Sequence, residues 1–491
     1  MKTQLHRRSF LARLLGGAAG LLILPSAQMA RAFPANERLR LAVFGAMYNA
    51  EHFLTAFHIY NADLVAVCNP DQRKIPGIVQ RWEETAQKLG ASAKADEQRA
   101  GERYRRLARL EGLGIYADIR RMFDEMGGRI DALVVSDYDH FHGVACGAAL
   151  RSGKPVCSER PLGLTIRDAR HLRALAAQSR LPTVYRSPGT AAGPFRRALE
   201  LVEDGAIGTV KEVHVWFDRG GPDRDAPPQG RQPAPEGLDW DLWLGPLPWR
   251  DYHPDWMAYS HWRETCNGGL GVFGMHTSIF PFLALKIRDL WDSPGAEIRV
   301  YADCSRLNRV SFPRWERVRW EIPARHRMPP AIITWHHGPG FAPGAREWIH
   351  DILRRHGVAK AEEADALMKT AGSILVGSDG VLVADDHSVR VTALPKERFA
   401  NINVDRPQRT AESRGIYSDW IDACRGASPR ILANFENGGR LSELVMLGNI
   451  ATLFPGQTLA YNTVAGQIAN LAEANQKLSF QYREGWRSPE P

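Results

Sequence analysis

The stretch that decides the fold is Leu39–Gly45, LRLAVFG, a short and almost continuously apolar run that ends in glycine. A helix-length segment at 49–60 separates it from a second apolar run, LVAVC, at 64–68. Strands that are apolar on both faces are typical of a parallel sheet covered by helices. The pattern predicts a doubly wound α/β domain, a Rossmann-type fold, over residues 38–185. The further strands expected in it lie at 131–136, 155–158 and 181–185.

A different pattern begins near residue 194. A helical segment leads into VKEVHVWF at 210–217, where apolar and polar residues alternate as in a strand with one buried face. Such runs predict a second, α+β domain over residues 186–485, built on an open and mostly antiparallel sheet. Its other expected strands lie at 298–302, 318–322, 331–335, 373–377 and 380–384.

Length and composition agree with two or three globular domains. The chain has 491 residues, of which 44% are hydrophobic and 24% charged. Its formal charge of +8 falls to +3 without residues 1–32, which carry five basic residues and no acidic one. This small excess does not indicate a nucleic-acid partner. No apolar run reaches the roughly 18 residues that a permanent membrane anchor needs.

The N-terminus has the pattern of a targeting signal. A tandem arginine pair in HRRSFL, at Arg7 and Arg8, precedes a short apolar stretch at 14–24 and the small-residue site Ala30-Arg31-Ala32. This order predicts a Tat-type signal peptide over residues 1–32, recognised by the Tat machinery, and a periplasmic or otherwise exported protein. An amphipathic N-terminal helix is the alternative. Because Tat substrates are exported folded, the signal also suggests a cofactor that is loaded before export.

Six cysteines lie far apart, with no CxxC motif and no Cys/His cluster at metal-binding spacing. We therefore expect free and mostly buried thiols, and no metal site.

The first expected strand ends in a turn that could hold a dinucleotide. Gly45, Ala46, Met47 and Tyr48 form this turn, where backbone N–H groups and a helix N-terminus would face a pyrophosphate. Only the first glycine of the three-glycine fingerprint is present. The second strand ends in Asn69, at the position that usually binds the adenosine ribose. With Arg73 close behind, NADP is as plausible as NAD, although Arg73 could equally be a solvated surface residue.

Three further stretches resemble sequence blocks of one enzyme family. They are Asp139-His140-Phe141-His142, the segment SERPL at 158–162, and Gly274-Met275-His276. They are similar to the DHxH, CEKPL and GxH blocks of the glucose-fructose oxidoreductase and inositol dehydrogenase family (Gfo/Idh/MocA). The resemblance implies a Rossmann domain with tightly bound NAD(P), a second domain that holds substrate and forms a homo-oligomer, and hydride transfer to or from a sugar or polyol.

The resemblance also implies roles for particular residues. In the second domain it places Trp262, Arg263 and His276 near the substrate, and it makes a cis peptide bond before Pro161 a candidate. For His140 and His142, a capping or supporting role is the alternative to a direct contact. The cofactor-binding residues implied by the matching blocks are Asp139, His140, His142, Glu159 and Pro161.

Two departures from the family pattern affect the chemistry. Arg160 replaces the lysine of the EKP block, and Val272 replaces an acid four residues before His276. Arg160 stays protonated and cannot be a base, but it can hold a developing alkoxide or a substrate anion. His276 is then the expected proton donor or acceptor. The alternative for His276 is a histidine that merely lines an apolar pocket.

The sequence therefore favours an exported NAD(P)-dependent oxidoreductase that acts on a sugar, a sugar acid or a cyclitol. An NAD-dependent glycosidase of the same family is the second hypothesis, and a catalytically degenerate carbohydrate-binding protein is the third. A group of tryptophans is expected either to stack on the sugar or to pack in the core. Its members are Trp240, Trp243, Trp249, Trp256 and Trp262.

Overall fold

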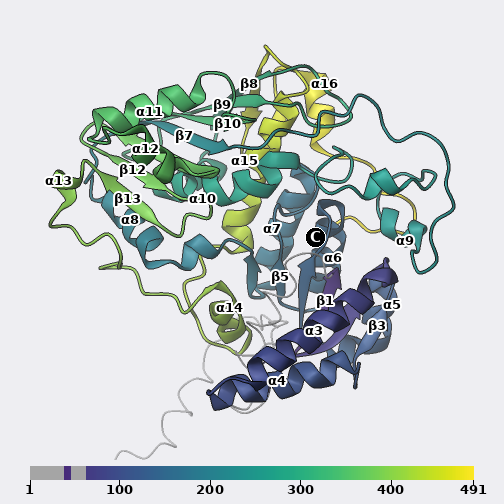
Figure 1. Ribbon diagram of the computed structural model, residues 1–491. Coiled ribbons are helices and arrows are strands. Elements are labelled where there is room, and N and C mark those ends of the chain that lie inside the picture. Colours follow the sequence, from purple (N-terminus) through teal and green to yellow (C-terminus); the bar gives the residue numbers. More distant parts are fainter. Residues whose placement is uncertain (1–37, 46–61, 491) are drawn as a thin grey trace, which may run out of the picture. The chain divides into compact units, whose positions relative to one another are not determined.

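A six-stranded parallel sheet is formed by the strands between residues 39 and 185 (Figure 1). The computed structural model describes residues 38–45 and 62–490, so the predicted signal segment and the predicted helix at 49–60 lie outside the described residues. The strand order is β3-β2-β1-β4-β5-β6, which is the order of a Rossmann domain and confirms the predicted fold class. The strands are β1 (Leu39–Gly45), β2 (Ala62–Cys68), β3 (Gly114–Tyr116), β4 (Ala132–Ser136), β5 (Val156–Ser158) and β6 (Thr183–Tyr185).

The two central strands, β1 and β4, are buried along nearly their whole length. Helices therefore cover both faces of the sheet, as the continuous apolar runs predict. The charged stretch at 72–113 folds into α3 and α4, which pack against each other (Figure 1), and α3 ends at Gly90. The helices of this domain are α3 (Ile75–Gly90), α4 (Ala95–Ala108), α5 (Ile119–Met126), α6 (Asp139–Arg151) and α7 (Ile166–Ser179).

A second, nine-stranded sheet follows, in the order β13-β12-β11-β7-β10-β9-β8-β14-β15. Neighbouring strands are antiparallel except for the parallel pair β7 and β10. The sheet is mostly antiparallel, as predicted. Its strands are β7 (Val210–Phe217), β8 (Glu297–Cys304), β9 (Glu316–Ile322), β10 (Ala331–His337), β11 (Ala371–Gly377), β12 (Val381–Ala384), β13 (Val391–Leu394), β14 (Thr458–Asn462) and β15 (Gln467–Ile468).

Helix α15 (Phe435–Ala451) connects the two sheets. Nearly all of its residues are buried, and it packs against α7 of the first domain as well as against strands of the second sheet. The side chain of Asn434 caps its N-terminus by accepting a hydrogen bond from the Asn437 backbone N–H. The other helices of this part are α8 (Gly193–Glu203), α9 (Trp240–Leu244), α10 (Met275–Ala284), α11 (Ala345–Arg355), α12 (Ala361–Met368), α13 (Lys396–Phe399), α14 (Ile416–Cys424) and α16 (Ala472–Asn475).

The part of the chain that the structure describes holds no helix that is both long and apolar enough to cross a bilayer. The six cysteines are free thiols, four of them buried. The proposed domain boundaries at 185 and 485 stay a prediction, since the described residues from Arg38 onward form one compact unit.

Candidate active site

Polar and charged side chains meet near the carboxyl ends of strands β4, β5 and β6. Asp139 opens α6 after β4, Arg160 follows β5, and Arg186 follows β6. Because parallel strands end at one edge of a sheet, these side chains share that edge. His276, in the first turn of α10, joins them from the second part of the chain, since the charges of Arg160 and Arg186 both influence it.

A buried ion pair is the centre of this group. Arg160 Nη1 donates a hydrogen bond of 2.6 Å to Glu159 Oε2, and both side chains are buried. The other carboxylate oxygen of Glu159 lies 3.8 Å from Arg186 Nε. Burial opposes the charge on Arg160, but the Glu159 carboxylate outweighs this effect and raises the pKa of the guanidinium. Arg160 is therefore a permanent cation. The Arg160–Pro161 peptide bond is cis, as the resemblance implies.

Asp139 is fully buried in the same region. Its Oδ2 accepts a hydrogen bond of 2.8 Å from the Asn267 backbone N–H. Its Oδ1 has no hydrogen-bond partner among the described residues. Burial raises the pKa of this carboxyl group, and Arg160 partly offsets the increase. An unpaired carboxylate oxygen in the interior costs free energy unless a ligand, a water or another group satisfies it.

His276 is the clearest candidate for proton transfer. It is only 1% exposed, and neither of its ring nitrogens has a hydrogen-bond partner among the described residues. Burial holds the pKa of His276 well below its ordinary value, and the nearby cations Arg160 and Arg186 act in the same direction. The imidazole is therefore neutral at pH 7 and able to accept a proton. A π-helical turn, Leu270–Gly274, leads directly into α10, and such turns occur frequently at functional sites.

An aromatic wall extends from His276 to the second sheet. The ring centroids of His276 and Phe273 are 6.3 Å apart, and Phe273 stacks on Phe217 at 4.1 Å with an angle of 17°. Phe217 in turn stacks on His337 at 5.6 Å. Phe217 and His337 end the parallel strands β7 and β10. Flat apolar faces of this kind suit the CH face of a ring-shaped substrate.

Sequence reasoning missed three residues of this site. His387 packs on His276, with 4.7 Å between the ring centroids, and Asp386 pairs with His387. Tyr259 is 37% exposed, and the charges of Asp139, Arg160 and Glu159 reach it. Burial of its hydroxyl and the Asp139 carboxylate raise the pKa of Tyr259, so the phenol stays protonated. These residues lie in turns and loops, where no periodic pattern marks them.

The turn after β1 makes a close contact that only glycine allows. Gly45 has φ +98, and a Cβ added there would lie 2.1 Å from Ser136 O on the neighbouring strand β4. Ala46, Met47 and Tyr48 lie outside the described residues. Asn69 Nδ2 donates a hydrogen bond of 3.0 Å to Gly45 O, so Asn69 joins the ends of β1 and β2. The carboxyl group of Asp137, after β4, has its pKa raised by burial to about 6.

Comparison with known proteins identifies the N-terminal domain. Residues 39–185 match the model of an oxidoreductase family with an NAD-binding Rossmann fold, the Gfo/Idh/MocA family. These residues therefore form an NAD-binding Rossmann domain of the Gfo/Idh/MocA type. No curated protein matches the sequence closely enough to be compared.

Solved structures share the fold of this chain at low sequence identity. The WlbA dehydrogenase from Bordetella pertussis, in complex with NADH and UDP-GlcNAcA, is 14% identical with a TM-score of 0.51, over 86% of this chain and 98% of the other. The aldose-aldose oxidoreductase from Caulobacter crescentus, complexed with glycerol, is 13% identical with a TM-score of 0.50, over 86% and 99%. These similarities concern the fold.

The described residues fit the NAD that the family binds. The strand order places β1 and β4 at the centre of the sheet, where a Rossmann domain binds its dinucleotide. The lack of a side chain at Gly45 leaves the backbone turn close to β4, as the phosphate-binding fingerprint requires. Of the remaining predicted cofactor-binding residues, Glu159 and Pro161 lie in the loop after β5, beside Arg160.

His140 and His142 act mainly on the protein itself. His142 Nδ1 lies 2.7 Å from Pro161 O, and its Nε2 lies 3.0 Å from Asp137 O, so the ring joins the loops after β4 and β5. His140 Nε2 lies 3.0 Å from Trp243 O. Burial lowers the pKa of His140 to about 4, so it stays neutral. These contacts favour the supporting role for both rings, and direct contact with the cofactor or substrate stays a prediction.

Trp262 and Arg263 make contacts within the protein, and the substrate role that the resemblance implies for them stays a prediction. Trp262 is buried, and its Nε1 donates to Asp255 O. Arg263 donates to backbone oxygens of Asn308 and Ser311 and stacks on Phe312, because its buried guanidinium needs several acceptors. The tryptophan group as a whole favours core packing: Trp240, Trp243, Trp256 and Trp262 are buried, while Trp249 is 60% exposed.

Arg73 is already paired in the structure. Its Nε and Nη2 donate to Asp71 at 2.6 and 2.9 Å, and this pairing raises the pKa of Arg73. Both residues follow β2, at the edge where the adenosine ribose of a dinucleotide is bound. The Asp71 carboxylate neutralises the cation that a 2'-phosphate would need. We therefore expect the protein to bind NADH more tightly than NADPH.

Replacing Asp71 with alanine should reduce the preference for NADH over NADPH. Freeing Arg73 to make one charge-assisted hydrogen bond is worth about 1.5–3 kcal/mol, which corresponds to roughly a tenfold or greater gain in NADPH affinity. Dissociation constants for NADH and NADPH, measured by nicotinamide fluorescence, check this. Adding Arg73→Ala to the variant should remove the gain. Unchanged NADPH affinity in Asp71→Ala would contradict the assignment.

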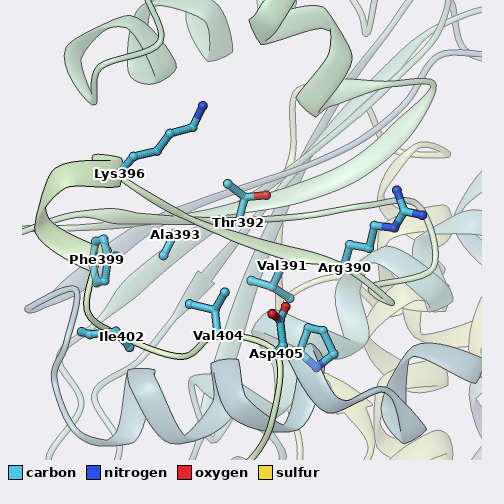
Figure 2. A pocket seen from close by; sticks show the side chains of 10 residues that line it. Arg390, Val391, Thr392, Ala393, Lys396, Phe399, Ile402, Val404 and Asp405 are labelled. Atoms are coloured by element: carbon cyan, nitrogen blue, oxygen red, sulfur yellow. The ribbon is translucent and has the colours of Figure 1, made fainter.

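A surface pocket of about 400 Å³ lies between β13, α13 and the start of α8 (Figure 2). Figure 2 shows Phe399, Ile402 and Val404 on one side of it and Arg390 at the far end. Neither Arg160 nor His276 lines it, so it is separate from the candidate active site.

Proposed function

We propose that this protein is an exported NAD-dependent oxidoreductase that transfers hydride to or from a carbinol carbon of a sugar, a sugar acid or a cyclitol. The observation that carries the proposal is His276, a buried and neutral imidazole whose two nitrogens lack partners among the described residues, near the permanent cation Arg160. A buried polar group without a partner is costly unless a ligand or water satisfies it. Here a substrate hydroxyl would satisfy it.

His276 moves the proton in this proposal. Oxidation of a carbinol requires a base within about 3 Å of the hydroxyl oxygen. The lowered pKa of His276 keeps its ring ready to accept that proton at neutral pH. In the reverse direction the protonated ring is a strong acid, because burial and the neighbouring cations disfavour its charge. One ring nitrogen therefore serves both directions.

Arg160 stabilises negative charge on the substrate. A buried guanidinium donates strong hydrogen bonds to an alkoxide or a carboxylate, and it keeps its charge throughout the reaction. Glu159 holds one of its nitrogens, Nη1, and leaves the remaining donors for other partners. Bound NAD supplies the hydride acceptor or donor.

The proposed substrate is cyclic and polyhydroxylated. The partly exposed ring of Phe273, near His276, offers an apolar surface, and Arg160 and Tyr259 offer polar groups. This combination suits a sugar, whose CH groups and hydroxyls lie on different sides. Fold neighbours include a dehydrogenase with NADH and UDP-GlcNAcA and an aldose-aldose oxidoreductase, so sugars and sugar acids are the first compounds to assay.

The test is to recover the mature protein from the periplasmic fraction of its host and to assay it directly. Export with cofactor, as the Arg7-Arg8 signal favours, predicts absorbance near 340 nm or nicotinamide fluorescence that stays with the protein through gel filtration. Addition of a sugar or sugar acid panel should then change the redox state of the bound nicotinamide. A reducible second sugar should restore it.

Three results would contradict parts of the proposal. If the protein is found only in the cytoplasm, the proposal that it is exported is wrong. Release of an aglycone without net change of nicotinamide redox state would favour the glycosidase hypothesis. If the protein binds neither NADH nor NADPH at millimolar concentration, only the hypothesis of a carbohydrate-binding protein without catalysis is left.

A further inference from the structure

The turn between β12 and β13 reaches into the candidate active site. It comprises residues 385–390, and its third residue, His387, packs on His276 with 4.7 Å between ring centroids and 44° between ring planes. The turn is tightly built. Asp385 Oδ1 accepts hydrogen bonds from the backbone N–H groups of Val389 at 2.7 Å and Arg390 at 3.2 Å.

Two further contacts fix this turn against the rest of the site. Ser388 Oγ donates a hydrogen bond of 3.2 Å to the backbone oxygen of His276. On the other side, a Cβ added to Gly189, in the 3-10 helix Pro188–Ala191, would lie 2.0 Å from His387 O. The absence of a side chain at Gly189 therefore lets the turn approach closely. His387 is held beside His276 from both sides.

Asp386 orients the ring of His387. Its Oδ1 lies 3.1 Å from His387 Nδ1 and also accepts a hydrogen bond of 2.8 Å from the His387 backbone N–H. These interactions with His387 hold the pKa of Asp386 below its ordinary value, so it is a carboxylate at neutral pH. A carboxylate at Nδ1 keeps the proton on that nitrogen and leaves Nε2 as the acceptor.

His387 differs from His276 in its access to solvent. The His387 side chain is 29% exposed, whereas His276 is 1% exposed. A proton that reaches His276 in the interior has to leave before the next turnover. His387 is the titratable ring that lies against His276 and is also in contact with water.

We propose that His387, oriented by Asp386, relays the proton between His276 and solvent. The proposal rests on the proposed function, in which His276 exchanges a proton with a carbinol. His387 is a positioning and relay residue. It contacts His276 through its ring, whereas His276 contacts the substrate.

The proposed step is balanced. In oxidation, the carbinol C–H bond breaks with transfer of a hydride to the nicotinamide, and the O–H proton passes to a nitrogen of His276. His276 then releases that proton through a bridging water to His387 Nε2, since neither His276 nitrogen is hydrogen-bonded to a described residue, and His387 loses its Nε2 proton to bulk water. Both rings return to their neutral forms. Reduction uses the same path in reverse.

The charges around this pair come from several elements. Arg160 after β5 and Arg186 after β6 face His276, and both disfavour a second positive charge. Asp386 faces His387, and Lys369, before β11, influences Asp386. Arg160 and Arg186 therefore favour loss of the proton from His276, and the Asp386 carboxylate favours its acceptance by His387.

The first test compares His387→Ala, His387→Gln and Asp386→Asn with the wild type in steady-state kinetics on the best sugar substrate. We expect kcat to fall by about 10- to 100-fold in both His387 variants, within the range for loss of an acid–base group, with KM and NADH affinity changed less than twofold. Asp386→Asn should give a smaller fall. Millimolar imidazole should restore part of the activity of His387→Ala but none of the activity of His387→Gln, in which the space is filled.

A matched control is available on α11. His350 Nε2 lies 2.8 Å from Asp365 Oδ1, so this is another partly exposed His–Asp pair. His350→Ala should leave kcat unchanged. Equal losses in His350→Ala and His387→Ala, or wild-type kcat in His387→Ala at every pH, would overturn the relay.

The second test does not depend on activity. NMR titration of the histidine ring signals in the NAD-bound protein should show that the pKa of His276 rises in His387→Ala, because His387, when it carries the relayed proton, disfavours a second positive charge on His276. An unchanged His276 titration would overturn the coupling of the two rings. A changed titration in a protein that oxidises no sugar would instead count against the proposed function and leave the His276–His387 coupling intact.

Discussion

Replacing His276 with alanine should lower kcat by about 100- to 10,000-fold, the range measured for loss of a general acid or base. The reason is that His276 is the buried imidazole with free ring nitrogens beside Arg160, whereas Arg160 cannot exchange a proton. NADH affinity should change less than twofold, because Gly45 and Asn69, which join β1 and β2 at the expected dinucleotide edge, keep their hydrogen bond when His276 is replaced. Stopped-flow measurement of a single hydride transfer separates this chemical step from product release.

Two variants make the interpretation of this result specific. His276→Gln keeps most of the side-chain volume and its hydrogen-bonding capacity but cannot transfer a proton, so it should be as inactive as the alanine variant. His326, which is 61% exposed and pairs with Asp289, is a surface control whose replacement by alanine should have no effect. The wild-type rate of oxidation should stay constant from pH 8 down to pH 6.5 and fall only below, since the pKa of His276 is lowered. Activity retained in His276→Gln would remove His276 from the mechanism.

Gly45→Ala should destabilise the protein by about 2–4 kcal/mol, combining the strain of a left-handed residue with a steric clash. The added Cβ would lie 2.1 Å from Ser136 O and 2.6 Å from Ser136 C, and backbone atoms of a central strand cannot move aside easily. The clash should push β1 away from β4 and weaken NADH binding as well. Urea denaturation followed by circular dichroism measures the stability, and fluorescence titration measures the affinity.

Gly112→Ala provides the matched control. Gly112 also has a positive φ, +71, and belongs to the same domain, but no atom lies within 4 Å of the Cβ that would be added. Its replacement should therefore cost only the conformational strain, about 1–2 kcal/mol, and leave NADH affinity unchanged. If Gly45→Ala and Gly112→Ala lower the free energy of unfolding by the same amount, the close contact between Gly45 and β4 contributes nothing beyond the conformational strain.

The strands that the sequence predicts best are those with a long apolar or alternating run. For β1 and β7 the predicted and observed bounds coincide. The prediction of one buried face is wrong for β7, because residues 213–217 are buried on both faces in the middle of the nine-stranded sheet. Short strands such as β3 and β13 carry too few residues for a period to appear. Helix α15 was not predicted because it is buried on nearly every side and has no polar face.

The candidate site shows a similar division. Arg160 and His276 could be found because they occupy positions in recognisable sequence blocks, and Gly45 because a strand ends there. His387 could not be found, since DDHS reads as an ordinary turn and its contact with His276 spans more than a hundred residues. For Arg73 the sequence left a phosphate ligand and a surface residue open, and the structure adds that its guanidinium pairs with Asp71.

The position of α15 determines how the molecule can move. Because this helix packs against α7 on one side and the nine-stranded sheet on the other, its apolar surface is shared between the two sheets. A hinge motion that separates the two sheets would expose this buried surface to water, which costs free energy. The same sharing should make thermal melting of both halves coincide in one cooperative transition.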